Sequence, residues 1–155
     1  MNDVSDPDAQ RWMGRAIDCA EEARDRGDDP FGSVIVADGE IVMEARNAVV
    51  TDNDVRSHPE LRLAARAISE YEPTKRATMS MYTSTEPCPM CAGGLRYTGL
   101  ERIVYSVSLR DFLVDIRGQE PLPVDATDIL TGVSSVDGPV LPVRGYELLD
   151  EFYTE

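Results

Sequence analysis

Two short segments of this chain carry the side chains of a metal site, although they lie far apart in the sequence. One is His-Pro-Glu at residues 58–60, and the other is Pro-Cys-Pro-Met-Cys at residues 87–91. One ion bound by His58, Cys88 and Cys91 would hold the two segments together, so the fold must bring them into contact. Three protein ligands leave a tetrahedral zinc ion with an open fourth position, which is typical of catalytic sites.

Glu60 is the fourth side chain of interest, because it lies close to His58 but need not bind the metal. A water at the open position of a zinc ion ionises near neutral pH. A carboxylate beside that water can accept and return protons, which is the role that we predict for Glu60. The alternative is a structural zinc site completed by Glu60 or Asp54. The chain has only one histidine and three cysteines, so no further thiolate pair or imidazole is available.

The length and the cysteine pattern favour one domain in a reducing compartment. We expect residues 1–155 to form a single domain, since this length suffices for a core of useful size. No apolar run is long enough to span a membrane, and the acidic start of the chain does not resemble a signal peptide, so a cytoplasmic location is expected. A Cys-x-x-Cys pair with a distant histidine favours metal over a disulfide. Cys19 lies in an apolar helical pattern and is interpreted as a buried side chain.

The charge balance bears on the partners of the protein. The chain has 29 acidic and 15 basic residues, a net charge of -14, and Lys75 is its only lysine. Such a surface repels phosphate backbones and argues against a large nucleic-acid interface. The same composition suggests adaptation to a salt-rich, halophilic cytoplasm, where salt would also screen the repulsion.

Hydrophobic periodicity and turn residues predict alternating helices and strands. Asp38-Gly39 lies between two apolar runs and is a strong hairpin signal. Helices are predicted over 7–26, from 59 onward, and over 90–97; strands are predicted over 33–37, 40–45, 78–84 and 103–105; residues 51–54 are a predicted loop. Beyond Ser108 the predictions are helical segments over 109–116, 126–130 and 146–152 and a strand over 140–143. This order indicates an α/β fold with a mixed sheet and helices on its faces.

Each predicted metal ligand lies at the start of a predicted helix. Cys88 and Cys91 are three residues apart in a first helical turn and therefore project from one face. A helix N-terminus carries partial positive charge and free N–H groups, which favour the thiolate form.

The order H-x-E followed by P-C-x-x-C is the signature of zinc nucleobase deaminases. Residues 30–36 (Pro-Phe-Gly-Ser-Val-Ile-Val) also resemble the first strand of guanine deaminases and related nucleoside deaminases, and residues 82–93 are similar to theirs as well. The chain therefore resembles the cytidine deaminase-like superfamily over about residues 10–107, closest to guanine deaminase and tRNA adenosine deaminase-type members.

The resemblance implies a three-layer α/β/α sandwich with a central mixed five-stranded sheet, Zn²⁺ as cofactor, and a homodimer. It implies that Asn47 contacts the substrate, although an asparagine after a strand is also ordinary turn chemistry. It places Phe31 at the wall of the base pocket, with plain core packing as the alternative. Asp111, Phe112, Phe152 and Tyr153 are further candidates for the pocket.

Pro59 departs from the family pattern, which usually has alanine, glycine or valine between the histidine and the glutamate. Proline has no backbone N–H. A substrate acceptor that this N–H binds in relatives would stay unpaired here, at a cost of about 1–3 kcal/mol if buried. Pro59 is therefore counted among the substrate-contacting residues, with an altered base or pose as the expected consequence.

Three functions follow from these observations. The first is hydrolytic deamination of a free nucleobase or nucleoside, with guanine-like purines ahead of cytosine. The second is tRNA-specific adenosine deamination, which would need a basic groove built from arginines such as Arg96, Arg102 and Arg110. The third is a non-catalytic, zinc-stabilised module, in which Glu60 would have no reason to stay free beside the metal.

Overall fold

A central five-stranded sheet organises the computed structural model, which describes residues 5–154. The strand order is β2-β1-β3-β4-β5. The strands are β1 (Gly32–Ala37), β2 (Glu40–Arg46), β3 (Ser80–Thr85), β4 (Arg102–Val107) and β5 (Ser135–Asp137). β1 pairs antiparallel with both β2 and β3, whereas β3, β4 and β5 are parallel to one another. The sheet is therefore mixed, as predicted.

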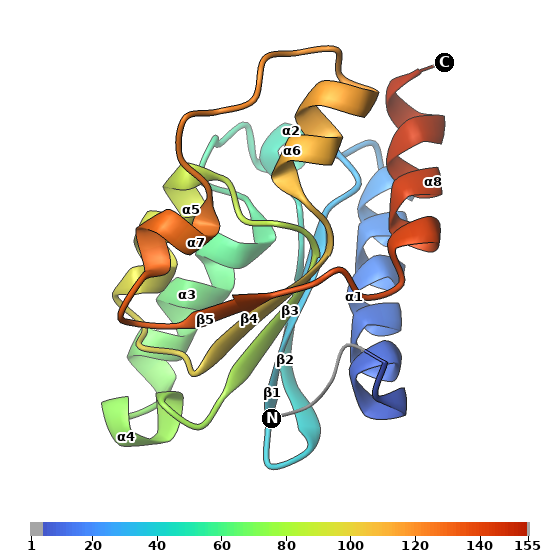
Figure 1. Cartoon of the computed structure of the whole chain (residues 1–155). Helices are drawn as coiled ribbons and strands as arrows, with labels where there is room; N and C mark the ends of the chain where they lie inside the picture. Colours follow the sequence, from blue (N-terminus) through green and yellow to red (C-terminus); the bar gives the residue numbers. More distant parts are fainter. Residues whose placement is uncertain (1–4, 155) are drawn as a thin grey trace.

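Helices cover both faces of this sheet and complete the three-layer α/β/α sandwich. The helices are α1 (Pro7–Asp25), α2 (Val49–Asp52), α3 (Pro59–Glu70), α4 (Pro73–Arg76), α5 (Pro89–Arg96), α6 (Leu109–Asp111), α7 (Ala126–Leu130) and α8 (Pro142–Tyr153), with a π-helical turn, η1, at Phe112–Ile116. Figure 1 shows α1 and α8 on one side of the sheet and α3, α5 and α7 on the other. Each face buries its own hydrophobic cluster, and a third cluster is formed by Val107, Leu109, Phe112, Ile116 and Leu149.

Local sequence accounts for several boundaries. Asp6 begins α1, where its carboxylate accepts a hydrogen bond from the Asp8 backbone N–H at 2.7 Å. Asp38 and Gly39 both have positive φ, at 53° and 78°, which fits the tight hairpin turn between β1 and β2. At Gly32, any side chain would collide with the backbone of α1, so this helix packs directly against the first residue of β1.

The C-terminal part corrects the sequence predictions. The strand predicted over 140–143 is wrong: the fifth strand is Ser135–Asp137, and residue 142 already belongs to α8. Val140 and Leu141 are more apolar than residues 135–137. However, prolines at 139 and 142 flank them and Leu141 has a φ of 51°, so these residues do not form a strand. The predicted loop over 51–54 is also partly wrong, because residues 49–52 form a helical turn.

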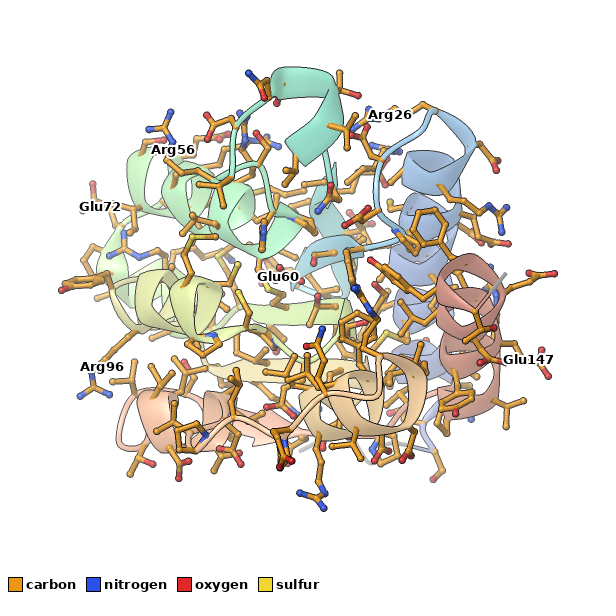
Figure 2. The ribbon with its side chains drawn as sticks, turned by 90° about the horizontal axis from the view of Figure 1, so that it is seen from above. Arg26, Arg56, Glu60, Glu72, Arg96 and Glu147 are labelled. Carbon is orange, nitrogen blue, oxygen red and sulfur yellow. The ribbon has the colours of Figure 1, made fainter. Side chains whose placement is uncertain are left out.

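The topology brings five chain segments to one edge of the sheet. Because β1 runs opposite to β3 and β4, the start of β1 lies beside the ends of β2, β3 and β4. The N-termini of α3 and α5 follow at the same edge. Figure 2 looks down on this end of the molecule and shows Glu60 near its centre. Within residues 5–154, no helix combines the length and apolar character needed to cross a membrane.

Candidate active site

His58, Cys88 and Cys91 converge at the edge of the sheet where α3 and α5 begin. His58 is the residue before α3, Cys88 is the residue before α5, and Cys91 lies in the first turn of α5. The two sulfurs lie 3.7 Å (Cys88) and 3.4 Å (Cys91) from His58 Nδ1. All three potential ligand atoms are within 4.8 Å of one another, so the group could hold one metal ion.

The spacing of these atoms fits a tetrahedral ion with nitrogen and sulfur ligands. With Zn–S near 2.3 Å and Zn–N near 2.0 Å, a tetrahedral angle separates the nitrogen and a sulfur by about 3.5 Å. The two observed Nδ1-to-sulfur distances lie on either side of that value. The donor set of one imidazole and two thiolates is also one that zinc prefers.

The two cysteines differ in their ionisation. A hydrogen bond from Cys91 lowers the pKa of Cys88 to about 4, and the imidazole of His58 acts in the same direction. The pKa of Cys91 is raised, because its thiol is the donor in that bond and is buried. The Cys91 thiol therefore keeps its proton to higher pH than the Cys88 thiol does. A metal ion that binds both sulfurs must displace this proton from Cys91.

Glu60 lies two residues after His58, in the first turn of α3, and only 5% of its surface is exposed. The Thr83 hydroxyl donates to Glu60 Oε1 at 2.6 Å, and Ser33 Oγ lies 3.4 Å from the same oxygen. Burial raises the pKa of this carboxyl group, and the hydrogen bond from Thr83 opposes that rise. Both hydroxyl contacts reach Oε1, and the carboxyl group also interacts with the thiol of Cys91.

A cavity of about 330 Å³ opens above these residues. Its lining includes His58, Glu60 and Cys88, so the metal-binding group and the carboxylate belong to one pocket. Aromatic rings form one wall. Phe31 and Phe112 meet edge to face with ring centroids 5.6 Å apart, and Tyr153 packs against Phe112 at 5.3 Å. Such a wall suits a flat heterocyclic ligand.

The structure places Asn47, Phe31 and Pro59, the three residues predicted to contact a substrate, in the lining of this cavity. Phe31 and Asn47 are neighbours in space, because the Asn47 backbone N–H donates to the Phe31 carbonyl at 2.9 Å. Asn47 Oδ1 accepts from the Val49 N–H at 3.1 Å. The amide oxygen of Asn47 thus accepts from the first residue of α2, and its Nδ2 is a donor that could bind a ligand.

The C-terminal half supplies further parts of the wall. Phe112 and Tyr153, which the sequence suggested, line the cavity, whereas Asp111 and Phe152 do not belong to the lining. Arg117 lies over the Tyr153 ring, with its guanidinium carbon 4.4 Å from the ring centroid. Through these contacts η1 packs against the end of α8, and the two segments form one side of the pocket.

Sequence reasoning missed several lining residues, among them Asp29, Thr85 and Arg117. Asp29 follows Asp28, whose buried carboxylate accepts from Thr51, so the two adjacent acids have different surroundings. In so acidic a chain, nothing in the sequence distinguishes Asp29 from a surface acid. Thr85 precedes the cysteine motif, and Arg117 lies beyond the segment that could be aligned.

Comparison with known proteins gives concordant results. The MafB19-like deaminase family matches residues 7–130. A probable cytosine deaminase of Schizosaccharomyces pombe is 31% identical over 147 residues, which cover 87% of this chain and 90% of that protein. Guanine deaminase of Bacillus subtilis is 34% identical over 103 residues, covering 66% of each chain. tRNA-specific adenosine deaminases are also among the similar proteins.

The fold is likewise shared with a solved structure. Guanine deaminase from Nitrosomonas europaea superposes with a TM-score of 0.80 at 20% sequence identity, over 96% of this chain and 85% of that one. The family match and these relatives thus show a hydrolytic deaminase of the nucleobase and nucleoside class. More particularly, the chain belongs to the MafB19-like deaminase family, whose match spans well over half of its length.

Proposed function

We propose that the protein is a zinc-dependent hydrolytic deaminase of a free nucleobase or nucleoside, with a guanine-like purine favoured and cytosine next. One observation carries the proposal. A three-ligand metal-binding group and a buried carboxylate share the floor of a cavity walled by aromatic rings. A structural zinc site would instead have four protein ligands and no cavity beside it.

His58, Cys88 and Cys91 would hold the metal, since their ligand atoms are close together and suit zinc. When bound by three protein ligands, zinc lowers the pKa of a water so that the nucleophile is available near neutral pH. The N-termini of α3 and α5 meet at this point and favour negative charge on the nearby sulfurs.

Glu60 would move the protons of the reaction. Its Oε1 accepts a hydrogen bond from the Thr83 hydroxyl, which limits how the carboxylate can turn. Glu60 accepts a proton as the water oxygen attacks the amino-bearing ring carbon. It then returns protons to the ring nitrogen and to the leaving amine, so that the C–N bond breaks and ammonia departs.

The remaining walls indicate how a base would be held. Phe31, Phe112 and Tyr153 offer apolar surface and ring edges to a flat ring. Asn47 offers one free donor, Nδ2, which suits a carbonyl oxygen on the substrate. Guanine and cytosine both carry such an oxygen, whereas adenine does not, which supports placing these two bases ahead of adenine.

Deamination of tRNA is the second candidate, because tRNA-specific adenosine deaminases are among the similar proteins. The surroundings of two arginines that were predicted to build a basic groove do not favour tRNA binding. Arg102 is nearly buried and paired with Asp137 at 2.9 Å. Arg96 donates to the carbonyls of Ile129 and Thr131, and Figure 2 shows it at the periphery, away from Glu60. The net charge of -14 also works against binding of a phosphate backbone.

The test is ammonia release by zinc-loaded protein in high KCl, measured with guanine, cytosine, adenine, their nucleosides and a few modified bases. A tRNA arm uses an adenosine-containing anticodon stem-loop as substrate and as competitor. We expect release from one or more free bases or nucleosides and no inhibition by the stem-loop. Release from the stem-loop alone would establish the second candidate. Zinc near one per chain without turnover on any compound would support the non-catalytic module.

A further inference from the structure

The Thr85 hydroxyl is a buried polar group that has no partner. Within residues 5–154, its Oγ1 is the one fully buried side-chain nitrogen or oxygen without a hydrogen bond. Only 4% of the Thr85 surface is exposed. Buried hydroxyl groups nearly always have a partner, because leaving one unpaired costs free energy. The unpaired Thr85 hydroxyl therefore suggests that a bound ligand supplies its hydrogen-bond partner.

Thr85 faces the active-site side of the sheet. Residues of β3 alternate between the two faces. Tyr82 packs with Trp12 of α1, at a centroid distance of 5.4 Å, whereas Met81 belongs to the cluster on the side of α3 and α5. Thr83 and Thr85 share the face of Met81. The Thr83 hydroxyl contacts Glu60 there, and Thr85, one step further along the strand, lines the cavity.

The hydroxyl groups on this face have different partners. Ser33 Oγ lies 2.7 Å from Thr83 Oγ1, and Thr83 in turn donates to Glu60. Ser33 and Thr83 are therefore engaged in orienting the carboxylate. The Thr85 carbonyl accepts from Thr83 Oγ1 at 3.3 Å, but the Thr85 hydroxyl is outside this chain of hydrogen bonds. Thr85 thus lines the pocket that a ligand would enter, and its buried hydroxyl has no hydrogen-bond partner among the described residues.

Two backbone donors that helix N-termini could offer are absent here. The first residues of both helices that begin here, Pro59 of α3 and Pro89 of α5, lack a backbone N–H. Helix N-termini ordinarily present such groups to a bound ligand. Side chains of the lining can supply donors in their place: the neutral ones are Asn47 Nδ2, the Thr85 hydroxyl, the Gln119 amide and the Tyr153 hydroxyl.

We propose that the Thr85 hydroxyl binds a polar ring atom or exocyclic oxygen of the heterocyclic substrate and thereby contributes to specificity. This inference rests on the proposed deaminase function. In the substrate-free protein the unpaired hydroxyl lowers stability, and the bound substrate supplies its partner. The alternative is an internal partner such as a trapped water, which would make the hydroxyl part of the folded structure alone.

Three variants separate these roles. Thr85→Val removes the hydroxyl and preserves the shape, and Thr85→Ser keeps the hydroxyl. Thr98→Val is the matched control, since Thr98 is equally buried but its hydroxyl donates to the Leu95 carbonyl at 2.6 Å and accepts from the Leu100 N–H at 3.1 Å, away from the cavity. For each zinc-loaded protein, the thermal midpoint without substrate and kcat/KM on the bases and nucleosides of the panel are measured.

We expect Thr85→Val to keep or raise the thermal midpoint and to lower kcat/KM about ten-fold, with Thr85→Ser within about two-fold of the wild type. Thr98→Val should lower the midpoint and leave kcat/KM unchanged. The inference is overturned if Thr85→Val retains full kcat/KM, or if it lowers the midpoint as Thr98→Val does. If the wild-type protein deaminates nothing in the panel, the proposed function itself fails and this inference falls with it.

Discussion

Thr83 donates its hydroxyl hydrogen to Glu60 Oε1 over 2.6 Å, so one carboxylate oxygen of the candidate catalytic residue is fixed by the central strand β3. Ser33 of the neighbouring strand β1 lies 2.7 Å from the same hydroxyl. Two strands of the sheet thus orient a side chain that the helix α3 presents. This pair of contacts limits how the carboxylate can turn, which we expect to keep it in position for proton transfer.

The first prediction concerns this hydrogen bond and the pH dependence of activity. The hydroxyl of Thr83 stabilises the charged carboxylate, so its removal should raise the pKa of Glu60 further. Because Glu60 must be ionised to accept a proton, the acid limb of the kcat/KM profile should move to higher pH in Thr83→Val. The profile of Thr83→Ser, which keeps the hydroxyl, should stay near that of the wild type. Superimposed profiles for the wild type and the valine variant would contradict this role.

The second prediction separates the two functions of Asn47. Its Oδ1 accepts the Val49 N–H at the start of α2, while Nδ2 is assigned to the substrate. Asn47→Asp keeps the acceptor and removes the donor, so the thermal midpoint should change little and kcat/KM should fall about ten-fold or more. Asn47→Ala removes both groups and should lose stability as well. If Asn47→Asp is fully active, the Asn47 side chain does not contact the substrate and contributes only its hydrogen bond to Val49.

Pro59 gives the third prediction. Pro59→Ala restores a backbone N–H at the first residue of α3 without touching His58, Cys88 or Cys91. Zinc content should therefore stay near that of the wild type, while relative rates across the base panel should change, by about five-fold or more for substrates with an acceptor at that point. The comparison is made between rates on different bases within each protein. Identical relative rates would show that the missing N–H has no part in substrate choice.

Much of the site could be predicted from the sequence because its chemistry depends on residue type at short spacing. His58 and the two cysteines carry metal-ligand chemistry in their side chains, and proline at the start of each helix marks where the helices begin. The mixed sheet and its hairpin followed from apolar alternation and the turn at Asp38 and Gly39.

The remaining parts depend on tertiary contacts that leave no local signal. Whether Thr85 has a hydrogen-bond partner depends on what other strands and helices place around it. The strand Ser135–Asp137 is short, polar and at the edge of the sheet, so its pairing with β4 rather than its own composition makes it a strand. Arg117 and Tyr153 meet only because α8 returns across the end of η1.

The fourth prediction concerns salt. A net charge of -14 produces repulsion among surface carboxylates, which added salt screens. The screening length falls from about 10 Å at 0.1 M salt to about 3 Å at 1 M. The thermal midpoint should therefore rise steadily as KCl increases over this range and beyond. A midpoint that is indifferent to KCl would contradict the salt-adapted interpretation of the composition.

The central claim is that Glu60 moves protons beside a zinc ion held by His58, Cys88 and Cys91. The most direct test compares ammonia release by the wild type and by Glu60→Gln, with zinc content measured on the same samples. Glutamine can still accept the Thr83 hydrogen bond, so the fold and about one zinc per chain should be retained while release falls at least about a hundred-fold. Equal release by the two proteins, with zinc bound in both, would contradict the account.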